Sequence, residues 1–328
     1  MNDDVNRRDF LRNALLATTG LAAGVSCAAQ AAEEKPPAAA AAAAPGEAKD
    51  KLPVGKLGSL SVTRLILGGN LLTRYQHARD LGYVNKLVKS YNTDDKVRET
   101  IELAEARGIN TLSVNITPGV LRILGDHRKN GGKIQTILYS TAKLEDAARF
   151  TDDLRQMTDF GTEAVYIWGE QSDRCLREGK MDLVKKALEE SKLAGVPCGI
   201  GCHELRVVQE VEKSGWPVDF YIKTFHHHHY PSAPRAGEAE RSTSEVPGYW
   251  CRNPEETAAF MQTVAKPWIA FKVMAAGAIP PRDAFKHSFE NGADFVLAGM
   301  FDFDIAEDCQ ILRETVAQVQ TRARPWRA

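Results

Sequence analysis

The chain has 328 residues, a formal net charge of −1 and 43% hydrophobic residues. This is the composition of a globular protein, and it excludes both a strongly basic nucleic-acid-binding protein and a long acidic tail. The length suits either two average domains or one (β/α)8 barrel. Only one run, close to the N-terminus, is apolar enough to raise the question of a membrane segment.

Residues 1–31 are typical of a secretory signal. Arg7 and Arg8 precede an apolar run at 14–25, and Ala29-Gln30-Ala31 offers a cleavage site made of small residues. The arginine pair, followed by Phe-Leu, resembles the twin-arginine export motif. The resemblance implies that the twin-arginine export machinery carries the protein, already folded, to the periplasm.

Two other readings of this segment remain open. The apolar run could anchor the chain in a membrane, although it is short for a bilayer. Cys27 could instead be lipidated, but the Leu usually found three residues before such a cysteine is missing. Residues 32–51 are mostly Ala, Pro, Glu and Lys, which cannot bury a core, so we expect a disordered linker there and no membrane span in the mature protein.

Strand-like and helix-like segments alternate from residue 57 onward. Strands are expected at 62–67, 109–115, 134–141, 163–168, 196–201, 218–224, 268–274 and 295–298. Helices are expected at 93–107, 118–130, 144–159, 181–194, 205–214, 254–264, 281–290 and 305–323. This α/β pattern predicts a single TIM-barrel domain, a (β/α)8 barrel over residues 52–328. An open doubly wound sheet is the alternative, but Gly68-Gly69 does not match the glycine pattern of its first turn.

Two parts of the sequence resemble the aldo/keto reductase family. Residues 55–69 are similar to the opening of these enzymes, and residues 104–110 to the entry into their second strand. Residues 271–277 and 299–302 are similar to exported reductase-like barrel proteins of bacteria. The resemblance covers the first two β/α units well. It implies the same barrel and, by analogy, an oxidoreductase that uses NADP.

The catalytic tetrad of the reductases is absent. Its Asp falls on Ser113, its Tyr on Pro118 and its His on Trp168, while its Lys falls near Ser140, with Lys143 a few places late. Reduction of a carbonyl by hydride needs a proton donor beside the developing alkoxide. With the family's Tyr and His both missing, we expect NADP to bind weakly or not at all.

The carboxyl ends of the strands carry residues that could bind a metal. Parallel barrels place their chemistry at this rim. Glu170, His203, His226 and His228 follow neighbouring strands, so they could hold a divalent metal ion with one position open. The bland alternative is that His203 packs as a structural residue and that the run of four histidines is a feature of the loop.

Lys272 is the other candidate catalytic residue, together with Glu170 and His203. The expected strand at 268–274 places its side chain inside the barrel, where an amine needs a partner. It could form a Schiff base or stabilise an oxyanion. An ion pair with Glu170 is the structural alternative.

Polar and aromatic residues in the loops are candidates for substrate binding. A long loop after the first strand could act as a lid, and the loop from 230 to 252 is longer still. The candidates are Asn70, His77, Arg79, Asn115, Tyr249 and Trp250.

Three functions fit these residues. The first is an exported enzyme acting on a small carbonyl or carbohydrate-like substrate by metal- or lysine-assisted lyase, isomerase or hydrolase chemistry. The second is an NADP-dependent reductase with a rearranged site, and the third is a ligand-binding barrel without catalysis.

Overall fold

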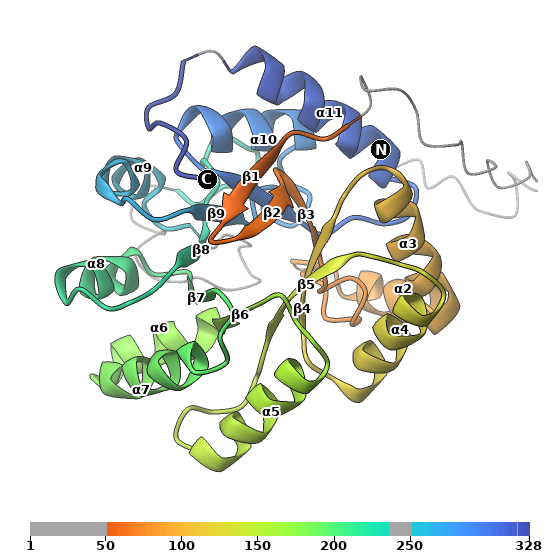
Figure 1. Ribbon diagram of the computed structural model, residues 1–328. Helices are drawn as coiled ribbons and strands as arrows, with labels where there is room; N and C mark the ends of the chain where they lie inside the picture. The colour runs from red at the N-terminus through yellow and green to blue at the C-terminus, as the bar shows by residue number, and fades with distance from the viewer. Residues whose placement is uncertain (1–50, 80, 236–250, 320) are drawn as a thin grey trace, which may run out of the picture. The chain divides into compact units, whose positions relative to one another are not determined.

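The computed structural model describes residues 51–79, 81–235, 251–319 and 321–328 (Figure 1). The predicted signal at 1–31 lies outside the described residues, and so does the predicted linker at 32–51 except for its last residue. Within the described ranges, no helix combines the length and hydropathy needed to cross a membrane.

Eight parallel strands close into a barrel, which confirms the predicted (β/α)8 fold. The strands follow one another around the ring in chain order, from β3 to β10, and β10 pairs with β3 to close it. Figure 1 shows the helices arranged around these strands. The strands are β3 (Leu65–Gly68), β4 (Thr111–Asn115), β5 (Gln135–Tyr139), β6 (Ala164–Ile167), β7 (Cys198–Cys202), β8 (Phe220–Thr224), β9 (Trp268–Phe271) and β10 (Phe295–Ala298).

The eight helices expected from the sequence are present. They are α3 (Asp94–Ala106), α4 (Pro118–Lys129), α5 (Ala147–Asp159), α7 (Met181–Lys192), α8 (Leu205–Lys213), α9 (Pro254–Thr263), α10 (Pro281–Glu290) and α11 (Ile305–Gln318). Two more are α2 (Gly82–Tyr91), which lies where the sequence suggested a loop, and α6 (Gly169–Arg177), which lies where no element was predicted. Neither begins with a side-chain cap, and each is an extra helix that precedes the regular helix of its β/α unit.

The first predicted strand is divided in two. Residues 62–67 span the junction between β2 (Leu60–Thr63) and β3, and β2 pairs with β1 (Val54–Leu57) as an antiparallel hairpin. Apolar side chains of the hairpin, Leu57 and Val62, join the cluster that fills the barrel. Because β2 leads directly into β3, the hairpin closes the amino end of the barrel and leaves the carboxyl end for a site.

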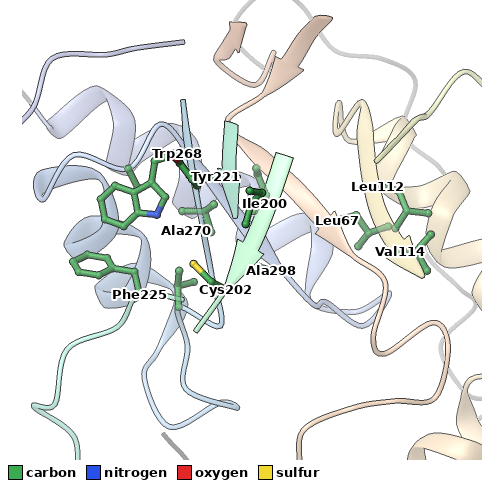
Figure 2. Packing of buried hydrophobic residues seen from close by; sticks show 14 of the residues in the cluster. Leu67, Leu112, Val114, Ile200, Cys202, Tyr221, Phe225, Trp268, Ala270 and Ala298 are labelled. Atoms are coloured by element: carbon green, nitrogen blue, oxygen red, sulfur yellow. The ribbon is translucent and has the colours of Figure 1, made fainter. Parts of the chain in front are cut away.

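The larger core lies between the strands and the surrounding helices. Figure 2 shows part of it, including Trp268, Phe225 and Cys202. The rings of Phe225 and Trp268 meet edge to face with their centroids 4.9 Å apart, a favourable aromatic geometry. The five described cysteines are all buried and free. The fold of this part therefore depends on packing rather than on disulfides.

Candidate active site

A cavity of about 550 Å³ lies at the carboxyl end of the barrel. Its size is that of typical small-molecule sites, and its wall is formed by residues that follow several different strands. The polar residues of the wall include Asn70, Ser113, Tyr139, Tyr166, Glu170, His203 and Lys272.

His203, at the end of β7, is held by Asp173 of α6. Its Nδ1 lies 2.7 Å from Oδ2 of Asp173, whose side chain is only 4% exposed. The same carboxylate accepts the backbone N–H groups of His203 at 2.9 Å and of Glu204 at 2.9 Å. Because a carboxylate can only accept, Nδ1 carries the proton and Nε2 keeps a lone pair. Nε2 is buried and has no hydrogen-bond partner among the described residues.

The surroundings of His203 keep its imidazole neutral. Burial, and then the nearby charge of Lys272, lower the pKa of His203 to about 4, although the hydrogen bond to Asp173 opposes both effects. A neutral imidazole with a free nitrogen, in the wall of a cavity, can take a proton from a molecule bound there. The bland reading of His203 as a fully satisfied packing residue leaves this nitrogen unexplained.

Lys272 lies at the cavity through an unusual backbone conformation. The strand expected at 268–274 ends at Phe271, so the prediction that Lys272 lies inside a strand is wrong. Its φ is 56°, and Ala275, Ala276 and Gly277 also have positive φ. A non-glycine residue in the left-handed region costs about 1–3 kcal/mol and such strain is concentrated at functional sites. The tight turn lets the segment after β9 form one wall of the cavity.

Two tyrosines that the sequence did not indicate complete the wall. Tyr139 ends β5 and Tyr166 lies on β6, with ring centroids 4.8 Å apart. Burial raises the pKa of both phenols above the ordinary value, so both stay protonated at neutral pH. The hydroxyl of Tyr139 lies 3.5 Å from Oδ1 of Asn70. These groups can donate hydrogen bonds to oxygen atoms of a ligand.

The run of four histidines contacts the far end of the same connection, between β8 and α9. Nε2 of His226 accepts the backbone N–H of Cys251 at 3.1 Å, and its Nδ1 lies 3.0 Å from the carbonyl oxygen of His227. Nε2 of His228 lies 2.6 Å from the carbonyl oxygen of Cys251. Both ring nitrogens of His226 are therefore engaged with the backbone, which leaves no nitrogen for a metal.

The predicted metal ligands do not come together. Glu170 lies exposed in the first turn of α6, while His226 is buried against the loop around Cys251. In the part of the chain that the structure describes, no group of three or more His, Cys, Asp or Glu side chains is arranged to hold a metal ion. Of the predicted set, Glu170 and His203 line the cavity.

The predicted substrate-binding residues are also divided. Asn70 and His77 line the main cavity. Arg79 lines a smaller neighbouring cavity and donates to Oγ of Ser232 at 2.9 Å, which joins the first loop to the loop after β8. Asn115 ends β4 away from both cavities. The predicted contributors Tyr249 and Trp250 lie outside the described residues.

The positions that replace the reductase tetrad are scattered. Ser113 and Trp168 line the cavity, whereas Pro118 is the first residue of α4 and serves to start that helix. None of the three can give a proton to an alkoxide as a tyrosine or a charged histidine does.

Comparison with known proteins supports the fold alone. No protein-family model matches the chain, and no curated protein does. Among solved structures, the chain is similar to the crystal structure of Gox0644 in its apo form, with a TM-score of 0.50 and 12% sequence identity. The match covers 80% of this chain and 93% of that one. The protein is thus a (β/α)8 barrel with a cavity at its carboxyl end.

Proposed function

We propose that the protein is an exported enzyme that moves a proton on a small hydroxycarbonyl compound, as an isomerase or a lyase. The observation that carries this proposal is the pairing of Asp173 with His203, a residue of the cavity wall whose Nε2 is buried and has no hydrogen-bond partner among the described residues. A base oriented by a carboxylate is the usual arrangement for abstracting a proton beside a carbonyl group.

Each charged residue has a role in this reaction. Nε2 of His203 takes the proton from the carbon next to the carbonyl, and the electron pair of the C–H bond moves to the carbonyl oxygen as an enolate. The ammonium group of Lys272 stabilises that oxygen. As negative charge develops on the oxygen beside Lys272, the lowering effect of Lys272 on the pKa of His203 diminishes, and Asp173 stabilises the imidazolium. The proton then returns to a neighbouring carbon, or a leaving group departs.

The acidic lining beyond β10 favours a substrate without phosphate. Barrels commonly bind phosphate at the loops after their last two strands, at a helix N-terminus. In this chain that helix is α11, and Asp304 and Asp308 at its start both line the cavity. Two carboxylates would repel a phosphate group. The same argument disfavours a nicotinamide dinucleotide bound there.

Exchange of carbon-bound hydrogen with solvent tests the proposal. Wild type, incubated in deuterated water with a panel of aldoses, ketoses and amino sugars, is expected to exchange the hydrogen next to the carbonyl of at least one of them, as followed by proton NMR. His203→Asn keeps a donor toward Asp173 and removes Nε2, so exchange should stop. His229→Gln changes an exposed histidine and serves as the matched control. A wild type that exchanges no member of the panel would overturn the proposal.

A further inference from the structure

The cavity wall also contains two acidic residues that the proposed mechanism does not use. Asp304, Asp308 and Phe301 line the cavity together, and we call these three residues the acidic cradle. The backbone N–H of Asp308 donates to the carbonyl oxygen of Asp304 at 2.9 Å, so the two carboxyl groups lie one helical turn apart. The N–H of Phe301 donates to Oδ2 of Asp304 at 3.2 Å, which fixes that carboxylate in place.

Asp308 is the buried member of the cradle. Its residue is 3% exposed, and within the described ranges its carboxyl group has neither a hydrogen bond nor an ion pair. Burial and then the neighbouring Asp304 raise the pKa of Asp308 to about 7. A buried carboxylate normally has a partner, because an uncompensated charge is costly away from water. Because no such partner lies among the described residues and Asp308 is in the wall of a cavity, we infer that the partner arrives with the ligand.

The chemistry of the cradle selects that partner. An anion is repelled, and a hydroxyl group can donate a hydrogen bond but cannot compensate the charge. A metal ion would need more ligands than the two carboxylates supply. A protonated amine brings one positive charge and three donors, enough to reach both carboxyl groups, and the ring of Phe301 can favour a cation at its face.

We propose that the acidic cradle binds a protonated primary amine, so that the substrate is an amino-substituted hydroxycarbonyl compound of the amino-sugar type. The amine site stands on the geometry of Asp304 and Asp308. Only the step from ligand to substrate rests on the proposed function of His203.

Paired probes that differ in a single group test the cradle. Glucamine and sorbitol have the same carbon chain, but glucamine carries an ammonium group where sorbitol carries a hydroxyl. At about pH 8 the amine remains protonated and Asp308 is ionised. Calorimetric titration of wild type is expected to show glucamine binding about tenfold or more tightly than sorbitol, as expected for a hydrogen bond between charged groups.

Matched variants assign the preference to the cradle. Asp308→Asn should reduce the ratio of the two affinities to about one, while Glu307→Gln, an exposed acid in the same turn, should leave it unchanged. Asp304→Asn should lower the ratio partly and provides a second reading if Asp308→Asn melts abnormally. Equal affinities of wild type for the two probes, or an unchanged ratio in both cradle variants, would overturn the inference.

The outcome is separable from the test of catalysis. His203→Asn should lose hydrogen exchange yet keep the amine preference, because it leaves the cradle intact. An amine preference in a wild type that exchanges no substrate would support the cradle and reject the proposed reaction. Exchange without an amine preference would reject the cradle alone.

Discussion

Replacing Asp173 by Asn should remove activity because it moves the ring proton of His203 from Nδ1 to Nε2. The carboxylate of Asp173 can only accept, which fixes the proton of His203 on Nδ1. An asparagine must also place its NH2 group, and two backbone N–H groups already point at this position. The amide oxygen will face these donors, its NH2 will face Nδ1, and the ring proton will move to Nε2. The cavity then receives a donor where the reaction needs a base.

The size of the effect follows from the contacts. Asp173 accepts three hydrogen bonds, from Nδ1 and the backbone N–H of His203 and from the backbone N–H of Glu204. Bonds to a charged acceptor contribute about 1.5–3 kcal/mol each, and the neutral amide keeps weaker bonds to the backbone. We expect a loss of about 2–4 kcal/mol in the free energy of unfolding. Loss of the base should lower kcat by about 10²–10⁴.

Three measurements on one variant check this reasoning. Nitrogen-15 chemical shifts of labelled histidine report which ring nitrogen carries the proton, urea unfolding reports stability, and hydrogen exchange into substrate reports turnover. Asp182→Asn, an exposed residue of α7, is the matched control. If Asp173→Asn reverses the tautomer but retains turnover within about twofold, far inside the expected loss, His203 is not the base.

Four further outcomes follow from the same chain. Lys272→Met should lower kcat about 100-fold or more while the protein stays folded, because the oxyanion loses its charged partner; wild-type turnover in this variant would contradict the role. Since burial lowers the pKa of His203 to about 4, below about 6.5 in the unfolded chain, its contribution to stability is complete above the unfolded value and is lost as pH falls. At about pH 5 the loss in the free energy of unfolding is about 2 kcal/mol. The free energy of unfolding, measured in urea at several pH values, should therefore fall more steeply with decreasing pH in wild type than in His203→Asn. The pKa of Asp308 is raised to about 7 in the folded protein, against about 4 in the unfolded chain. Ionisation of Asp308 therefore destabilises the folded protein increasingly as pH rises above about 4, and the full loss is reached above about 7. Asp308→Asn should therefore be more stable than wild type at about pH 8 by about 1–3 kcal/mol, and the gain should vanish at about pH 4. Arg7→Lys combined with Arg8→Lys should retain the protein in the cytoplasm, as cell fractionation would show; normal export would reject the twin-arginine interpretation.

The barrel could be predicted because its signal is repeated. Each strand of a parallel barrel is buried on both faces and reads as a short apolar run, and each is followed by an amphipathic helix. The errors occur where this alternation is broken. Helix α2 and helix α6 are extra elements inserted between a strand and its regular helix, and the first expected strand combined β2 with β3.

The site could be predicted only in part, because sequence position shows the strand ends and not the partners. His203 follows β7 directly and was found for that reason. Its partner Asp173 lies 30 residues earlier in the unexpected helix α6, so nothing local links the two. Tyr139 and Tyr166 lie within strands and read as packing residues. His226 was misjudged in the opposite direction, since the backbone of Cys251, which occupies its Nε2, is 25 residues away.

Three features that cost stability converge on one cavity, and this convergence is the strongest argument that the cavity is functional. Lys272 holds a left-handed backbone conformation, and Asp308 is a buried acid with a raised pKa. Nε2 of His203 is buried and has no hydrogen-bond partner in the described part of the chain. Each costs on the order of 1–3 kcal/mol, in a protein whose total stability is on the order of 10 kcal/mol. A barrel that only packs, or one that binds a ligand through shape alone, has no need to retain all three. Proton abstraction needs the first two together, because a base and an oxyanion partner must face the same atoms of the substrate. The third feature, Asp308, concerns substrate choice rather than proton transfer. A buried carboxyl group at the cavity wall selects a substrate that carries a positive charge.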